Sequence, residues 1–544
     1  MASRRTLLFK VLPALALTAL MGCQSAKAPD GVATAPKLKT KPLVLLISDG
    51  FGVREDAPDN SVTQAATPFL DRVYQEYPHT TLEASGRAVG LPQGNVGSSE
   101  VGHMHIGGGR LINQNITRVD VAIEENKLAE NPTLQKAIQA SKGHTMHIIT
   151  LWSDGGIHSH MNHTLAVMDV ALAQGVERIV VHPITDGIDA PPISAKKYLQ
   201  VLQDYVGKHK QVSIGTVSGR VWGMDRDKKW EKVLPVYDSL TGSGAPYKAK
   251  SAMDALEKAY ARKEKDKEMK TTLVDTKNVV KDGDVVLYMN FRADRARALT
   301  QAFTWDDFDG FKRKKRPKLG YFATLTSYGE QFKNDVMFEP QPVQNGFGEY
   351  ISGKGLRQLR IAETEKYAHV TYFFNGGNEQ PYPNEDRVVI PSPKVASYDL
   401  KPEMSTPEIA QKVVEAVNSG KYEVIITNFA NTDMVGHTGS LEAAKKAVES
   451  VDKAMNDITD ATLAKGGAVL ITSDHGNCEV MYDEVNKQPH VQHTTNHVPL
   501  IYISKDKKAK LKSGGSLKDV SPTMLKILGL PQPAEMTGES LISK

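Results

Sequence analysis

Short apolar runs alternate with helical patterns along most of the chain, and this alternation predicts an α/β fold. The runs lack alternating polar positions, which indicates parallel strands that are covered on both faces. Helical patterns lie between them at 406–420, where Pro407 stands near the start and Gly420 at the end, and at 441–467. The runs that predict this first sheet are LVLLISDG at 43–50, EVIITNFANTD at 423–433, AVLITSDHG at 468–476 and VPLIYIS at 498–504.

The middle of the chain repeats the pattern separately and predicts a second sheet. Because candidate site residues occur both before it, at Asp49, and after it, from Asp433 onward, the simplest topology inserts this second α/β domain into the first. We expect the first domain to comprise 43–115 and 341–544, and the inserted domain 116–340. The runs concerned are MHIITLWSDGG at 146–156, RIVVHPITDG at 178–187, VSIGTVSGR at 212–220 and DVVLYMNFR at 284–292.

The N-terminal residues indicate an export signal. Arg4, Arg5 and Lys10 lie beside an apolar stretch at 11–21 that is too short to span a bilayer. The following LMGC resembles a bacterial lipoprotein cleavage box, so residues 1–22 would be removed and Cys23 acylated. Residues 23–42 then predict a flexible linker.

This segment predicts a membrane-anchored lipoprotein on the periplasmic side. Gln24, rather than Asp, follows Cys23, which favours the outer membrane. The alternatives are an uncleaved apolar anchor or a mis-assigned start codon, and the protein is cytoplasmic if the segment is not processed.

Composition and charge exclude several classes of protein. The 544 residues are 40% hydrophobic and 24% charged, as in ordinary globular proteins. The net charge is +4, from 67 basic and 63 acidic residues, and does not indicate the basic surface of a nucleic-acid-binding protein. The charge runs at 263–270 and 312–318 indicate solvent-exposed surface. Cys23 and Cys478 are the two cysteines, so no disulfide framework exists.

Acidic residues and histidines gather at the ends of the predicted strands of the first sheet. Asp433 and His437 are spaced to share one face of a helical turn. A lone histidine is more often a hydrogen-bonded structural residue, but a set that recurs at strand ends indicates metal. Oxygen and nitrogen ligands without thiolate favour Mn²⁺ or Zn²⁺, and their number suits two ions. The set comprises Asp49, Asp433, His437, Asp474, His475 and His493.

A glycine-rich segment at 90–110 carries Ser98 and Ser99 and offers a nucleophile. A serine hydroxyl is a weak nucleophile at neutral pH, but a divalent cation that binds it directly lowers its pKa. The alternative, a flexible Gly/Ser connection, is weakened by the charged and histidine side chains among the glycines. These are Glu100, His103, His105 and Arg110.

From about Leu43 to the C-terminus, the sequence resembles the cofactor-independent phosphoglycerate mutases of the alkaline phosphatase superfamily. The strings include ISDGFG, GSSEVGH, SDGGIHSH, SGRVWGMDRDKKW, NFRADRAR, AETEKYAHVTYFFNGG, NFANTDMVGHTG and SDHGN. The resemblance implies an alkaline-phosphatase-like parallel-sheet domain with a second α/β domain inserted. It also implies a glycolytic isomerase that interconverts 3- and 2-phosphoglycerate without 2,3-bisphosphoglycerate. We expect the protein to be a monomer.

The resemblance also assigns roles to residues of this chain. It implies two Mn²⁺ ions, or similar ions such as Zn²⁺ or Co²⁺. One ion would bind Asp433, His437 and His493, and the other Asp49, Ser99, Asp474 and His475. Ser99 would be the phosphorylated nucleophile and Asp189 the proton shuttle. The substrate contacts would be His158, Asp189, Arg220, Arg226, Arg292, Arg295 and Lys366.

Two positions depart from the family pattern. Ser98 stands where the family has Asn, and Ile188 stands where the family has the Arg of an Arg-Asp pair, before Asp189. The loss of one substrate cation keeps a second function open, an exported metal-dependent phosphatase or phosphomutase that acts on another phosphate ester. A third, an inert surface lipoprotein, is disfavoured because all seven metal-site positions are present.

Overall fold

A computed structural model describes residues 36–543. The predicted signal segment, Cys23 and most of the 23–42 linker lie outside these residues. The last linker residues pack on the fold, because the backbone N–H of Lys39 donates to the carbonyl of Leu528 at 2.9 Å. Within residues 36–543, no helix has both the length and the apolar character needed to cross a membrane.

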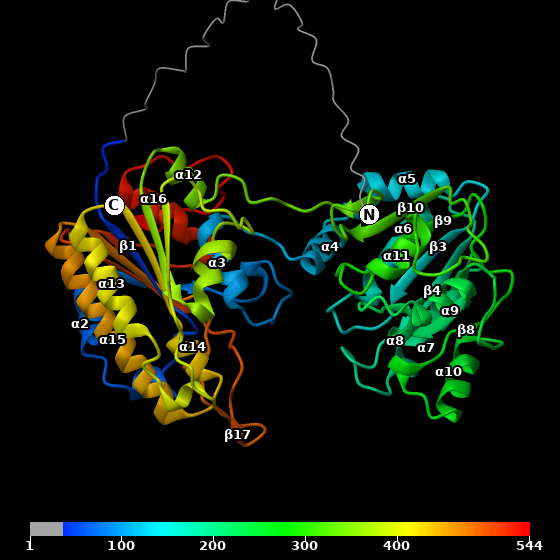
Figure 1. The fold of residues 1–544 in the computed structure, drawn as a ribbon, viewed down its shortest axis with the longest axis horizontal. Helices are drawn as coiled ribbons and strands as arrows, with labels where there is room; N and C mark the ends of the chain where they lie inside the picture. Colours follow the sequence, from blue (N-terminus) through cyan, green and yellow to red (C-terminus); the bar gives the residue numbers. More distant parts are fainter. Residues whose placement is uncertain (1–35, 544) are drawn as a thin grey trace, which may run out of the picture.

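The chain forms two lobes, each built on one sheet (Figure 1). The first lobe holds an eight-stranded sheet in the order β13-β12-β14-β1-β15-β18-β2-β20. The first five strands of this order are parallel to one another. The strands are β1 (Leu43–Ser48), β2 (His79–Glu83), β12 (Gln358–Glu363), β13 (Glu385–Ile390), β14 (Val424–Phe429), β15 (Ala468–Thr472), β18 (Val498–Ile503) and β20 (Gly515–Ser516).

Strand β1 is apolar at almost every position because helices cover both faces of its sheet. Val44 and Leu46 pack in the core formed with α13 (Thr406–Ser419) and α15 (Leu441–Ala464). Leu43, Leu45 and Ile47 pack in the opposite core, with α16 (Val520–Leu528). The prediction of strands buried on both faces is therefore confirmed for β1.

The prediction that 498–504 is a parallel strand is wrong, because β18 pairs antiparallel with β15, with Ile471 opposite Ile501. Parallel neighbours need a crossover, which is usually a helix, whereas antiparallel neighbours do not. Between Thr472 and Val498 the chain has no helix and instead forms the hairpin of β16 (Tyr482–Asp483) and β17 (Gln488–Pro489).

The second lobe holds a nine-stranded sheet in the order β11-β10-β9-β3-β4-β6-β8-β7, with β5 also paired to β4. All of its strands fall in one continuous stretch of chain between the strands of the first sheet, and the α/β class is confirmed. The domain limits at 115 and 341 stay a prediction. The strands are β3 (Met146–Leu151), β4 (Ile179–Thr185), β5 (Val212–Ile214), β6 (Thr216–Gly219), β7 (Tyr247–Lys248), β8 (Thr272–Leu273), β9 (Val285–Tyr288), β10 (Tyr321–Thr326) and β11 (Asp335–Phe338).

Candidate functional site

Three carboxylates converge where β1, β14 and β15 end. Asp49 directly follows β1, Asp433 lies in α14 (Asn431–Gly436) after β14, and Asp474 follows β15. Because these strands are parallel neighbours, their carboxyl ends meet at one edge of the sheet. All three side chains are buried.

Ser99 lies among these carboxylates as the first residue of α3 (Ser99–Gly108). Its hydroxyl donates to Asp49 Oδ1 at 3.1 Å, lies 3.0 Å from His475 Nε2 and accepts from Lys366 Nζ at 2.7 Å. The N-terminus of a helix favours negative charge, so Ser99 is well placed to carry an alkoxide or a phosphate.

The neighbouring glycine and serine explain how α3 reaches this position. A Cβ on Gly102 would lie 2.6 Å from the carbonyl oxygen of Asp474, so only glycine lets the helix approach the end of β15 this closely. Ser98 is the N-cap of α3, and its hydroxyl accepts from the backbone N–H of Val101 at 3.4 Å.

The histidines surround Asp433. Its Oδ1 lies 3.2 Å from His437 Nε2 and 3.1 Å from His493 Nε2. His475 Nε2 is 4.0 Å from the same oxygen and 3.5 Å from Asp49 Oδ1, so His475 stands between the two groups of ligands. The structure therefore brings together the whole predicted metal set.

The donor atoms nearest to one another form two groups, and each could hold a metal ion. Asp433, His475 and His493 present ligand atoms within 4.8 Å of one another, and so do Asp49, His103 and Asp474. This division differs from the sets that the sequence resemblance implied, because it moves His475 and adds His103.

The electrostatics of the site fit divalent cations. Burial and the negative charge of Asp474 raise the pKa of Asp49 to about 6. Lys366 is the ammonium that bonds to these carboxylates, at 2.7 Å from Asp49 Oδ1 and 2.6 Å from Asp433 Oδ2. One ammonium leaves two of three buried negative charges uncompensated when the histidines are neutral, and buried charge of this kind is unfavourable. Oxygen and nitrogen donors without thiolate suit Mn²⁺ or Zn²⁺.

Two residues outside the predicted site set, His103 and Asn428, connect the carboxylates through hydrogen bonds. His103 Nδ1 lies 3.2 Å from Asp474 Oδ2 and 2.9 Å from the carbonyl of Ser99, while its Nε2 lies 3.1 Å from Asn428 Nδ2. The Asn428 amide also donates to Asp49 Oδ2 at 2.7 Å. Both ring nitrogens of His103 thus have protein partners, which favours a positioning role. The i, i+4 spacing of Ser99 and His103 is the signal in the sequence.

The predicted substrate residues, apart from Lys366, gather in the second lobe. Arg220 Nη1 pairs with Asp186 Oδ1 at 2.6 Å and with Asp189 Oδ2 at 2.7 Å. Arg226 and Arg292 face Asp294, at 3.7 and 3.4 Å. The structure places Lys366 against the nucleophile in the first lobe instead. Figure 1 shows α8 (Arg220–Gly223) on the side of its lobe that faces the first lobe.

Ile188 lies beside this cluster with its side chain in solvent. It is 56% exposed, and its backbone N–H donates to Asp186 Oδ1 at 3.1 Å. The side chain therefore adds no polar group to this cluster of guanidinium and carboxylate groups.

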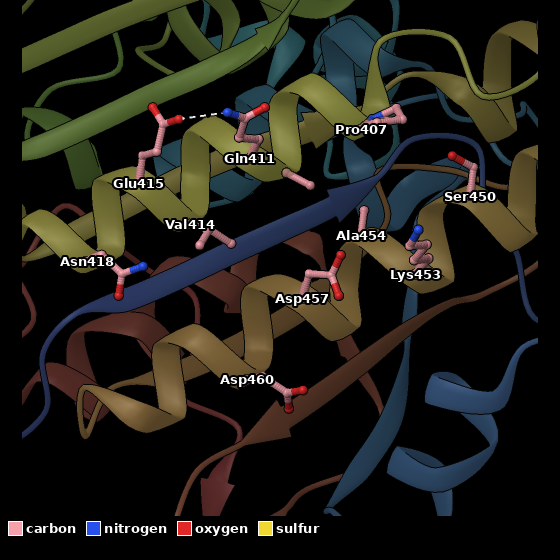
Figure 2. A pocket seen from close by; sticks show the side chains of 11 residues that line it. Pro407, Gln411, Val414, Glu415, Asn418, Ser450, Lys453, Ala454, Asp457 and Asp460 are labelled. Carbon is pink, nitrogen blue, oxygen red and sulfur yellow. Dashed lines mark hydrogen bonds between the residues drawn. The ribbon is translucent and has the colours of Figure 1, made fainter.

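A groove of about 770 Å³ on the outer face of the first lobe is separate from this chemistry (Figure 2). It runs between α13 and α15, and none of its lining residues is among the candidate site residues. The residues that line it are Pro407, Ala410, Gln411, Val414, Glu415, Asn418, Ser450, Lys453, Ala454, Asp457 and Asp460.

The fold and the convergent carboxylates, histidines and serine are typical of a metalloenzyme. The model of the metalloenzyme superfamily matches residues 41–532. Within that superfamily the chain belongs to the 2,3-bisphosphoglycerate-independent phosphoglycerate mutases.

Relatives of that description are similar over nearly their whole length. The chain is 52% identical to the enzyme of Chromobacterium violaceum over 503 residues, which cover 92% of this chain and 99% of the relative. It is 47% identical to that of Thiobacillus denitrificans over 512 residues, covering 93% and 100%. A crystal structure of Leishmania mexicana phosphoglycerate mutase, at low cobalt concentration, is 31% identical with a TM-score of 0.58 and covers 93% of this chain and 98% of that one.

Proposed function

We propose that this protein interconverts 3-phosphoglycerate and 2-phosphoglycerate through a phosphoserine at Ser99. The observation that carries the proposal is the position of the Ser99 hydroxyl, at a helix N-terminus and within 3.1 Å of Asp49, His475 and Lys366. The relatives that are about half identical are described as phosphoglycerate mutases, which supports the same reaction.

The ligand sets that the family resemblance implies are the ones we propose. Asp433, His437 and His493 would hold one Mn²⁺, and Asp49, Ser99, Asp474 and His475 the other. When bound, the ions neutralise the excess carboxylate charge and lower the pKa of the Ser99 hydroxyl. Lys366 donates to Ser99 Oγ and would stabilise negative charge there.

The guanidinium groups of the second lobe suit the carboxylate end of the substrate. Those of Arg220, Arg226, Arg292 and Arg295 lie beside the carboxylates of Asp186, Asp189 and Asp294, and the exposed Asp227 also faces Arg226 at 4.0 Å. Planar guanidinium groups bind a carboxylate through paired hydrogen bonds. The phosphate would then lie toward Ser99 in the other lobe.

The reaction balances within one bound molecule. Ser99 Oγ bonds to phosphorus as the bond from phosphorus to O3 breaks, and O3 takes a proton. Glycerate reorients, O2 bonds to phosphorus as the bond to Ser99 Oγ breaks, and O2 loses its proton. Asp189, fixed by Arg220, would act as a proton shuttle for the glycerate hydroxyls. Water must be excluded meanwhile, because hydrolysis of the phosphoserine would turn the mutase into a phosphatase.

A second function, a phosphatase or phosphomutase for another phosphate ester, is favoured by one observation. Ile188 gives the substrate pocket an apolar side chain at the family's arginine position. A panel of phosphate esters tested beside both phosphoglycerates distinguishes the two. Faster turnover of another ester by at least tenfold in kcat/KM favours the second function, and faster interconversion of the phosphoglycerates favours the first.

We also propose that the protein is exported and anchored through Cys23, and that it is a monomer. The export-signal pattern of residues 1–22, which precede the segment that matches the superfamily, supports the export and the anchor. Fractionation of the source cells and the mass of the mature N-terminus test the location. Light scattering tests the oligomeric state.

A further inference from the structure

Two loops meet within the cluster of predicted substrate residues in the second lobe. His158 lies in the loop after β3, and Asp294 in the loop after β9. The loops are joined through their backbones, since the N–H of Phe291 donates to the carbonyl of His158 at 2.8 Å. The two side chains are therefore held at a defined separation.

His158 Nδ1 and Asp294 Oδ1 face each other at 3.6 Å. Both atoms are buried, and neither has a hydrogen-bond partner within residues 36–543. The His158 side chain as a whole is only 4% exposed. Buried polar atoms normally find partners, so two unsatisfied atoms this close together indicate a bond that a small displacement completes. Catalytic hydrogen bonds are often long in substrate-free structures and shorten when the substrate binds.

The surroundings favour an ionised carboxylate and a neutral imidazole. Asp294 Oδ1 lies 3.4 Å from Arg292 Nε, and its Oδ2 lies 3.7 Å from Arg226 Nη1. Burial and the positive charge of Arg220 lower the pKa of His158 to about 4. A neutral imidazole can donate from one nitrogen and accept a proton at the other.

We propose that Asp294 is a positioning residue that accepts the Nδ1–H of His158, and that Nε2 of His158 accepts the proton of a glycerate hydroxyl. This inference rests on the proposed mutase function. As the hydroxyl oxygen bonds to phosphorus and the bond to Ser99 Oγ breaks, the proton passes to Nε2, and the reverse step returns it. The reaction involves two hydroxyls, and the pocket would thus offer two proton acceptors, Asp189 and His158.

The kinetic test is a double-mutant cycle with the metal-loaded enzyme. Asp294→Asn should lower kcat about 10- to 100-fold with KM changed less than about threefold, since general acid–base groups contribute factors of this size. If Asp294 acts through His158, the double variant His158→Asn/Asp294→Asn should be no slower than His158→Asn alone. Asp227→Asn is the matched control, because Asp227 also faces Arg226, at 4.0 Å, but is 61% exposed. It should change kcat less than about twofold.

A second measurement needs no turnover. Nitrogen-15 NMR of the metal-free wild type should show His158 as the Nδ1–H tautomer, and Asp294→Asn should populate the Nε2–H tautomer. Independent kinetic effects of the two substitutions, or the Nε2–H tautomer in the wild type, would overturn the inference. Absence of mutase activity in the wild type would refute the proposed function instead, and the tautomer would still test the contact.

Discussion

Replacing Ile188 by arginine tests whether the substrate pocket lacks a cation. Ile188 is 56% exposed, so a longer side chain needs no space in the core, and its backbone bond to Asp186 is retained. The change should alter the free energy of unfolding by less than about 0.5 kcal/mol. It should add one positive charge beside Asp189.

The gain in activity follows from one charge-assisted hydrogen bond. Such a bond is worth about 1.5–3 kcal/mol when buried. Solvent at this exposed position screens it, which reduces the expected gain to about 1–2 kcal/mol. At 1.4 kcal/mol per factor of ten, kcat/KM for phosphoglycerate should rise about 5- to 30-fold.

The assay is steady-state interconversion of 3- and 2-phosphoglycerate by wild type and Ile188→Arg. Ile193→Arg is the matched control, because Ile193 follows in the same loop, is 65% exposed and adds the same charge. It should change kcat/KM less than about twofold. If the wild type is already efficient and Ile188→Arg brings no gain in kcat/KM, the pocket does not lack a cation. Another cation then makes the contact with the substrate.

Three further predictions follow from the first lobe and the N-terminus. Ser99→Ala should abolish mutase and phosphatase activity, while its thermal unfolding temperature stays within a few degrees of that of the wild type. Labelled phosphate that is transferred from the substrate to a residue other than Ser99 would contradict this prediction. Chelation should silence the enzyme. At pH values below about 7 the affinity for metal, measured by calorimetry, should decrease. The hydrogen bond with Asp433 raises the pKa of His437 above 6.5, and a proton bound to His437 competes with the metal. Turnover by metal-stripped protein would refute the requirement for metal. Mass spectrometry should find acylated Cys23 as the N-terminus, and an intact Met1 would contradict that.

The sequence predicted the strands, and it predicted that the candidate metal-site residues come together at the strand ends. β1, β14 and β15 are apolar because they are buried on both faces. Asp49 follows β1 directly, Asp433 lies in α14 after β14, and Asp474 lies just after β15. The predicted direction of β18 was wrong because an apolar run looks the same in the sequence whether the strand is parallel or antiparallel. Only its connection, a hairpin without a helix, decides the direction.

The residues that the sequence missed act through distant partners. Asn428 lies inside a strand, and its bond to Asp49 joins residues 379 positions apart in the chain. Asp294 stands between two predicted substrate arginines, but its neighbour His158 comes from another strand end. Lys366 was predicted as a substrate contact from the first domain, and the structure places its ammonium on Ser99 because β12 lies beside β14 in the first sheet.

The most direct test of the central claim is phosphorus-31 NMR of the purified, Mn²⁺-loaded protein with 3-phosphoglycerate, followed by mass spectrometry of the quenched enzyme. We predict that the 2-phosphoglycerate signal grows to equilibrium with little free phosphate, and that phosphate is trapped on Ser99. Release of inorganic phosphate without 2-phosphoglycerate, or an unmodified Ser99 during turnover, would contradict the account.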